Sequence, residues 1–202
     1  MHAPLNFLVV ITDHQRFDSL GMLQNGREVM PRLNRFAREA MVFDRAYTTA
    51  PLCIPARTAM ATGQYPTQGI PINDFSGEEA REQALATTAL EQRGYRIGYI
   101  GKNDIRVRPS GREQHPASIW LDKAEYEAWL KAAGYSSHPG WEGREEAFHD
   151  YYYKEVEEVL ADRVNASRYS HPATGKWTGP KEAFRDFYFA DRMESWLEEA
   201  SQ

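Results

Sequence analysis

The chain's only cysteine, Cys53, stands at the start of a segment with the features of a short helix. Pro55 suits a first helical turn, residues 56–62 can continue the helix, and Gly63 can adopt the left-handed conformation that ends it. A helix N-terminus presents N–H groups and the positive end of the helix dipole, which stabilise an anion. Arg57, about one turn further on, can direct its guanidinium donors to the same point. These residues predict an anion-binding site beside a thiol.

Two apolar runs predict strands whose ends could carry further site residues. Residues 6–12 are apolar and β-branched, as in a parallel strand covered on both faces, and Asp13 and His14 follow them. Residues 95–101 predict a second strand, which Lys102 follows. Ligand crevices in open α/β sheets lie beyond the carboxyl ends of the strands, so these side chains are expected at a site. From the residues alone, a turn aspartate and a solvated lysine remain alternatives.

Packing elements are expected between these strands. Residues 31–40 have helical spacing of apolar side chains, and residues 41–43 form a weaker candidate strand. Ser76 and Glu79 have the form of a capping box for a helix that Gly94 would close. Strand, helix and strand would then make a parallel crossover.

After residue 108 the chain becomes polar, rich in aromatic residues and mostly helical. A capping box begins at Asp122, and His115 precedes a proline and is expected in a loop. Three apolar stripes predict helices packed on the core, formed by Trp129, Leu130 and Ala133; by Phe148, Tyr152, Val156, Val159 and Leu160; and by Phe184, Phe187, Tyr188, Trp196 and Leu197.

The motif Cys-x-Pro-x-Arg at residues 53–57, followed by Thr-x-Met-x-Thr-Gly at residues 58–63, resembles the signature of the sulfatase family, including its phosphonate monoester hydrolase branch. In that family a maturation enzyme oxidises the cysteine to formylglycine, an aldehyde whose hydrate is the nucleophile. The resemblance implies that Cys53 is the precursor of this nucleophile and that a formylglycine-generating enzyme is a partner. The alternative is a small buried cysteine with a packing role.

The resemblance also implies a divalent metal. Residues 12–21 resemble the family's opening strand and acidic metal ligand, which implies Asp13, His14 and the modified Cys53 as ligands. The family's metal is calcium, which takes ~6–8 oxygen ligands. Imidazole suits manganese or another transition metal better, so His14 leaves the metal open between calcium and manganese.

The cations of the expected anion pocket are Arg57 and Lys102. Gly101-Lys102 resembles the family's Gly-Lys pair, which contributes to sulfate binding, and the resemblance implies catalytic roles for Cys53, Arg57 and Lys102. The family usually has histidine two residues after this lysine, whereas this chain has Asp104.

The two strong strands cannot bury a parallel sheet by themselves, because such strands need neighbours on both sides and helices on both faces. The resemblance, recognisable over residues 6–102, implies an α/β fold: the N-terminal part of an alkaline phosphatase-like three-layer fold with a mostly parallel central sheet, followed by a helix-rich segment. We expect residues 1–202 to be the N-terminal portion of a sulfatase domain. Residues 1–108 would hold the core strands, nucleophile helix and crossover, and residues 109–202 a helix-rich insertion and a helix leading to a missing strand.

Composition excludes several other classes. Lys and Arg number 24 against 29 Asp and Glu, for a net charge of -5, so no basic surface favours nucleic acid. One cysteine excludes an internal disulfide framework. The N-terminus has no positive n-region, and no apolar run reaches the ~20 residues of a membrane span. We therefore expect a cytoplasmic protein with no nucleic-acid or membrane partner.

The expected function is hydrolysis of a small-molecule sulfate ester by a formylglycine nucleophile at residue 53, incomplete within these 202 residues. The hydrate would attack sulfur, and rebuilding of the carbonyl would expel sulfate, with a metal and two cations stabilising the charge. The alternatives are a phosphonate monoester or phosphodiester hydrolase with the same nucleophile, and a non-catalytic fragment that only binds anions.

Overall fold

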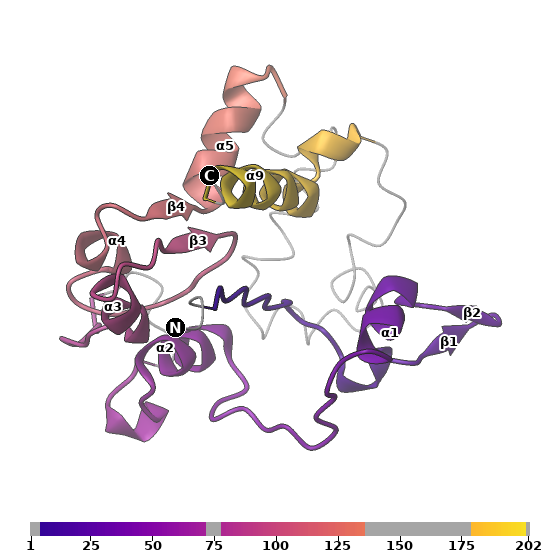
Figure 1. The fold of residues 1–202 in the computed structure, drawn as a ribbon, viewed down its shortest axis with the longest axis horizontal. Coiled ribbons are helices and arrows are strands. Elements are labelled where there is room, and N and C mark those ends of the chain that lie inside the picture. The colour runs from indigo at the N-terminus through magenta and orange to yellow at the C-terminus, as the bar shows by residue number, and fades with distance from the viewer. Residues whose placement is uncertain (1–4, 72–77, 136–178, 201–202) are drawn as a thin grey trace, which may run out of the picture. The chain divides into compact units, whose positions relative to one another are not determined.

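The computed structural model describes residues 5–71, 78–135 and 179–200, and the chain divides into two compact units, Met1–Tyr47 and Thr48–Gln202 (Figure 1). The elements of the described residues are, in chain order, η1 (Phe17–Ser19), β1 (Leu23–Gln24), β2 (Arg27–Glu28), α1 (Pro31–Ala37), α2 (Cys53–Thr62), η2 (Pro66–Gln68), α3 (Ala86–Glu91), β3 (Gly98–Ile100), α4 (Gly111–Gln114), β4 (Ile119–Leu121), α5 (Lys123–Ala132), η3 (Lys181–Ala183) and α9 (Arg185–Ala200). The structure is therefore mixed α/β with small sheets.

In the N-terminal unit, β1 and β2 form an antiparallel hairpin followed by α1. The turn between the strands is Asn25-Gly26, and both residues have positive φ (51° and 74°), which matches the twist that two-residue hairpins favour. The Asn34 Oδ1 atom of α1 accepts a hydrogen bond of 2.8 Å from the Gly21 N–H. This bond joins α1 to the segment before the hairpin. The hairpin itself was not predicted from the sequence.

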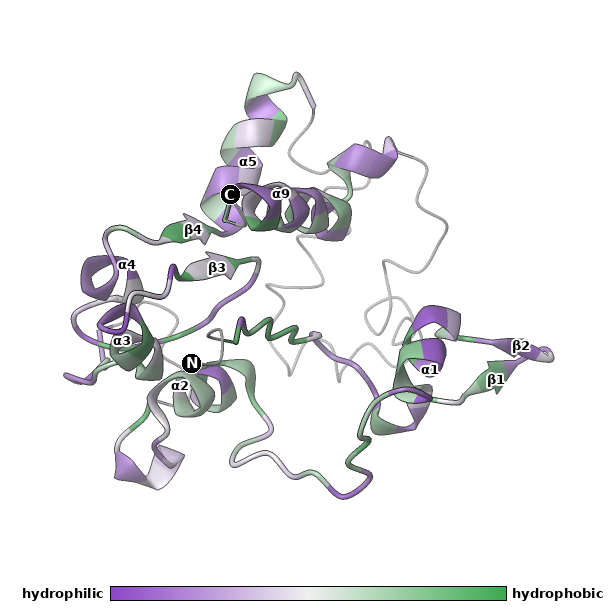
Figure 2. Ribbon diagram, in the orientation of Figure 1, coloured by the Kyte–Doolittle hydropathy of each residue, from purple (hydrophilic) through white to green (hydrophobic). Residues whose placement is uncertain are grey.

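The apolar run at residues 5–12 forms no strand (Figure 2, where it is green). Its side chains are exposed, with Val10 77% accessible, and the weaker candidate strand at residues 41–43 is also exposed, with Phe43 73% accessible. Both strand predictions are wrong for the described structure. A strand needs a hydrogen-bonded neighbour and a covered face, and no described segment pairs with either run.

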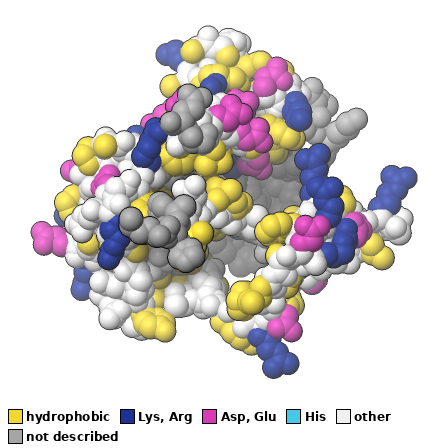
Figure 3. Space-filling model, in the orientation of Figure 1, with side chains coloured by type: hydrophobic (Ala, Val, Ile, Leu, Met, Phe, Trp, Pro, Cys, Tyr) yellow, Lys and Arg dark blue, Asp and Glu magenta, His cyan; other side chains and the backbone are white. Residues whose placement is uncertain are grey.

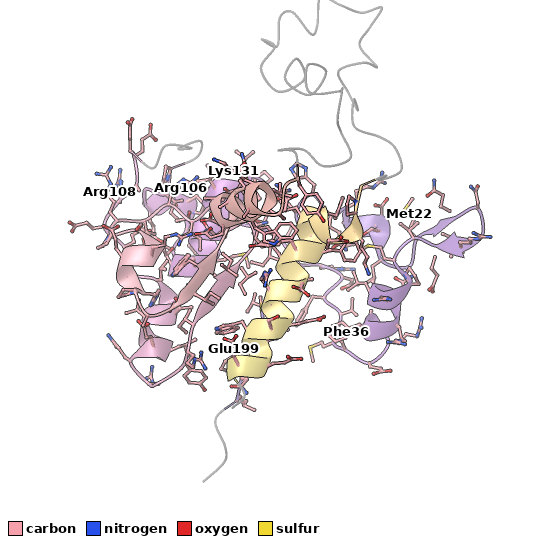
Figure 4. The ribbon with its side chains drawn as sticks, turned by 90° about the horizontal axis from the view of Figure 1, so that it is seen from above. Met22, Phe36, Arg106, Arg108, Lys131 and Glu199 are labelled. Carbon is pink, nitrogen blue, oxygen red and sulfur yellow. The ribbon has the colours of Figure 1, made fainter. Side chains whose placement is uncertain are left out.

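The helix predicted for residues 31–40 is shorter and less buried than expected. It ends at Ala37, and Phe36, one of its predicted packing residues, is 68% accessible. Phe36 is labelled in Figure 4, together with Met22 of the same unit. Figure 3 shows apolar side chains exposed on the molecular surface. The N-terminal unit therefore has little apolar core of its own within the described residues.

In the C-terminal unit, β3 confirms the predicted strand at residues 95–101 over its last part. It pairs in parallel with β4, with Gly98 opposite Ile119, Tyr99 opposite Trp120, and Ile100 opposite Leu121. β4 lies inside the segment expected to be helix-rich and was not predicted, because three residues carry too little periodicity to be recognised. The observed crossover runs from β3 through α4 to β4.

The helix before β3 is shorter than predicted. α3 begins at Ala86 with Leu85 as its N-cap, and residues 78–85 are not helical. The expected N-cap, Ser76, lies outside the described residues. The expected closing residue, Gly94, does adopt the left-handed conformation with φ 85°. The C-terminal end of this helix was therefore predicted correctly and its start was not.

A small core is formed by side chains from β4, the start of α3 and the segment between β3 and α4. Leu85, Val107 and Trp120 are buried together, and the rings of Tyr99 and Trp120 stack with centroids 4.0 Å apart. His115 is fully buried at the C-cap of α4 rather than in an open loop. Its Nδ1 lies 2.7 Å from Glu91 Oε2 and its Nε2 lies 3.0 Å from Thr87 Oγ1, so both ring nitrogens have polar partners.

Burial also raises the pKa of Tyr99 above its ordinary value, and the nearby Glu91 carboxylate adds to this increase, while its hydrogen bond with Thr87 acts in the opposite direction. The hydroxyls of Tyr99 and Thr87 are 2.6 Å apart. Tyr99 is therefore a neutral hydrogen-bonding member of this core.

A second cluster joins α5 to α9, which lie side by side in Figure 1. The Tyr126 hydroxyl donates a 2.7 Å hydrogen bond to the Ala183 carbonyl. The capping box at Asp122 is confirmed, and Leu130 and Tyr188 are buried as predicted. Phe187 and Leu197 are instead 47% and 40% accessible, and the stripe at residues 148–160 lies outside the described residues. None of the helices described here is both long and apolar enough to cross a bilayer.

The second cluster generates a stability prediction. Leu130→Ala removes a side chain that is 1% accessible, and we expect a loss of ~2–5 kcal/mol in the free energy of unfolding, measured by urea denaturation. Leu197→Ala is the matched control on a leucine that is 40% accessible, with an expected loss below about 1 kcal/mol. Equal losses in the two variants would contradict the packing described for α5 and α9.

Candidate anion-binding site

Helix α2 forms as the sequence predicts, with Cys53 as its first residue. Leu52 before it is extended, and Gly63 ends the helix in the left-handed conformation (φ 72°), donating its N–H to the Ala59 carbonyl at 2.8 Å. Cys53 is half-buried, whereas Ile54 is 1% accessible. Buried side chains such as that of Ile54 pack α2 into the C-terminal unit, and the Cys53 thiol lies at the N-terminus of the helix.

Arg57 connects α2 to the loop that follows β3. Its side chain is buried, and its Nη1 donates a 2.8 Å hydrogen bond to the backbone carbonyl of Lys102. A buried guanidinium is costly unless its donors find acceptors, so this bond has a structural role as well as an electrostatic one. The structure thereby brings together the helix of Cys53 and the backbone of Lys102, which is 45 residues from Arg57 in sequence.

Thr58 provides a second connection between the same two segments. It is fully buried, and its Oγ1 accepts a 3.0 Å hydrogen bond from the backbone N–H of Arg106. Its carbonyl accepts a 2.8 Å bond from the Thr62 hydroxyl. The sequence reading included Thr58 in the motif but gave it no role, and its contact with Arg106 has no signal in the local sequence.

The loop at residues 101–106 begins where β3 ends and carries three charged side chains. The Gly101 N–H donates to the Leu121 carbonyl at 2.7 Å, which extends the β3–β4 pairing to the base of the loop. Lys102 Nζ lies 3.3 Å from Asp104 Oδ2, and Arg106 Nη2 lies 4.0 Å from Asp104 Oδ1. Arg106 is labelled in Figure 4. The loop therefore holds one carboxylate between two cations.

This arrangement can bind and stabilise an oxyanion. The N-terminus of α2 favours negative charge, and Arg57 and Lys102 add two cations on segments that are joined by hydrogen bonds. Donors that are held in place before the reaction stabilise charge that develops in a transition state, because they need not reorganise. These residues are therefore candidates for a site that binds an oxyanion.

The predicted metal ligands Asp13 and His14 belong to the N-terminal unit, whereas Cys53 belongs to the C-terminal unit. His14 Nε2 lies 4.0 Å from Asp13 Oδ2, and the His14 side chain is 90% accessible. Among the described residues, no group of three or more His, Cys, Asp or Glu side chains could hold a metal ion. Because calcium takes ~6–8 oxygen ligands, these donors do not suffice for it, and the ligand set stays a prediction.

Comparison with known proteins places these motifs in a wider context. The family model described as Sulfatase matches residues 5–200. The ulvan-active sulfatase of Formosa agariphila is 32% identical over 98 residues, which are 48% of this chain and 19% of the relative. The steryl-sulfatase of Mus musculus is 32% identical over 133 residues, or 59% of this chain and 21% of the relative.

Human arylsulfatase A is 27% identical over 113 residues, which are 54% of this chain and 22% of the relative. The chain thus spans about a fifth of the length of these three relatives. No solved structure matches the chain significantly.

The connection through Thr58 can be tested by an isosteric change. Thr58→Val removes the acceptor of the Arg106 N–H, and we expect that amide to exchange its hydrogen faster, with a loss of ~1–3 kcal/mol in stability. The measurement is hydrogen exchange followed by mass spectrometry of the peptide that contains residue 106. Thr62→Val, one turn further along α2, is the control that should leave this exchange unchanged. Unaltered exchange in Thr58→Val would show that the contact does not hold the loop.

Proposed function

Since the chain belongs to the sulfatase family, we propose that it contributes the nucleophile and part of the anion pocket of a hydrolase that acts on sulfuric esters. The observation that carries the proposal is the hydrogen bond from Arg57 to the Lys102 carbonyl, which joins the motif helix to the loop with the second predicted cation. The substrate would be a small-molecule sulfate ester.

Cys53 is proposed as the precursor of the nucleophile. Oxidised to formylglycine by a formylglycine-generating enzyme, it would supply a hydrated aldehyde with two hydroxyls. One would attack sulfur while the S–O bond of the ester breaks and the alcohol leaves; deprotonation of the other would then expel sulfate and restore the aldehyde. Its half-buried position in the first turn of α2 supports this role, because the residue is partly exposed and lies at the positive end of the helix.

Arg57 and Lys102 are proposed to hold the sulfate group and the charge that develops on its oxygens. Arg57 is fixed by burial and by its bond to the loop, whereas the Lys102 side chain is 37% accessible and can meet a ligand from solvent. Arg57 and Lys102 together would bind the ester and stabilise the negative charge that develops on its oxygens in the transition state.

A divalent metal is part of the proposal for the complete site, with Asp13, His14 and residue 53 as ligands and calcium or manganese as the ion. The described residues supply too few donors, so no step of the reaction is derived through the metal. Three further statements likewise stay proposals: the complete alkaline phosphatase-like fold, the domain bounds at residues 108 and 202, and the cytoplasmic location.

Two alternatives rest on the same residues. A phosphonate monoester or phosphodiester hydrolase would use the same nucleophile and cations, since these esters also carry tetrahedral oxyanion groups. A non-catalytic fragment that only binds anions would use the same helix N-terminus and cations without turnover.

The first experiment concerns the nucleophile. When the complete gene product is co-expressed with a formylglycine-generating enzyme, we expect the tryptic peptide with residue 53 to carry the mass of an aldehyde in place of the thiol. Cys53→Ala is the control, since its peptide should have an unchanged mass with or without the enzyme. An unmodified thiol under these conditions would contradict the proposed nucleophile.

The second experiment concerns the reaction. The matured complete gene product should hydrolyse an aryl sulfate, and Arg57→Lys should lower kcat/KM by about 10²-fold, because a lysine cannot keep both the fork of donors and the bond to the Lys102 carbonyl. Initial rates with an aryl sulfate and with an aryl phosphonate monoester are compared. Faster turnover of the phosphonate would favour the first alternative, and turnover of neither would favour the second.

A further inference from the structure

Asp104 lies at the centre of the charged loop after β3 in an unusual backbone conformation. Its φ is 47°, in the left-handed region that side chains other than glycine seldom adopt, although Asp and Asn tolerate it best. Its side chain is only 20% accessible and lies between Lys102 (Nζ to Oδ2 3.3 Å) and Arg106 (Nη2 to Oδ1 4.0 Å). Strained conformations of this kind often accompany functional sites.

The carboxylate is held at a fixed place relative to α2. The loop is bonded to the helix on both sides of Asp104, through the Lys102 carbonyl to Arg57 at 2.8 Å and through the Arg106 N–H to Thr58 at 3.0 Å. The Gly101 N–H, bonded to the Leu121 carbonyl at 2.7 Å, fixes the base of the loop to the sheet. An anion bound by Lys102 must therefore share that cation with the negative charge of Asp104.

We infer that Asp104 determines charge selectivity at the proposed site, favouring esters with one negative charge over ligands with two. The inference rests on the proposed function, since it concerns the same anion pocket. The electrostatic energy of an anion in a given potential is proportional to its charge, so a fixed carboxylate disfavours a dianion about twice as strongly as a monoanion. A sulfate ester is a monoanion, and the inorganic sulfate released from it is a dianion.

Two consequences follow for the reaction. Asp104 would weaken the binding of inorganic sulfate more than that of the ester, which favours release of the product. It would also disfavour phosphate monoesters, which carry two charges at neutral to alkaline pH, relative to sulfate esters and phosphonate monoesters. Without the Asp104 carboxylate, the two cations of the proposed site, Arg57 and Lys102, would hold the dianion more tightly.

The test is Asp104→Asn, which removes the charge and keeps the shape and the left-handed conformation. Binding of inorganic sulfate (a dianion) and of methanesulfonate (a monoanion) to the complete gene product is measured by isothermal titration calorimetry at low salt. We expect the variant to bind both anions more tightly, with the gain for sulfate about tenfold larger than that for methanesulfonate. The thermal unfolding temperature of each variant is recorded alongside.

Asp122→Asn is the matched control. Asp122 is also a carboxylate paired with a guanidinium, at 3.0 Å from Arg112 Nη2, but its side chain serves as the N-cap of α5 and accepts a 2.9 Å hydrogen bond from the Ala124 N–H. We expect this control to lower stability and to leave the ratio of the two affinities unchanged.

Equal gains for the two anions in Asp104→Asn, or a change in unfolding temperature without a change in the ratio, would overturn the inference. So would failure of the unsubstituted protein to bind either anion. The proposed hydrolysis is judged separately by turnover of the aryl sulfate, because a protein that binds these anions selectively and cleaves no ester would retain the charge selectivity and lose the catalytic function.

Discussion

The hydrogen bond from Arg57 to the Lys102 carbonyl is the contact on which the rest of the candidate site depends. It gives a buried guanidinium N–H an acceptor. Without that acceptor, the charge of Arg57 would lie in a low-dielectric environment with a donor unsatisfied, which is costly. The same bond fixes the loop after β3 to the helix that begins at Cys53. Arg57 therefore positions the backbone at Lys102, and in the proposed site it would also contribute charge.

The parts of the structure that the sequence predicted correctly depend on local chemistry. The bounds of α2, its end at Gly63, the closing role of Gly94 and the capping box at Asp122 are all decided within one or two helical turns. The expectation that Arg57 and Lys102 share an anion pocket followed instead from resemblance to known sulfatase motifs, and their hydrogen bond was not predicted. Periodicity and spacing alone left Lys102 open to a reading as a solvated lysine.

The features that were predicted wrongly or not at all depend on contacts between distant segments. Residues 5–12 have the composition of a buried strand, but a strand forms only when another segment supplies its hydrogen bonds, and no described segment does so. β4 is too short to show a period, and its pairing with β3 could not be read from either segment alone. The contact of Thr58 with the Arg106 N–H and the burial of His115 beside Glu91 are likewise products of tertiary packing.

The central claim is that α2 and the loop at residues 101–106 act as one anion-binding unit. The most direct measurement is hydrogen exchange of the complete gene product with and without inorganic sulfate, followed peptide by peptide. We expect amides in residues 53–57 and 102–106 to gain protection together as sulfate is added, because the two segments are joined through Arg57 and Thr58. Protection in only one of these segments, or in neither while sulfate protects another part of the protein, would contradict it.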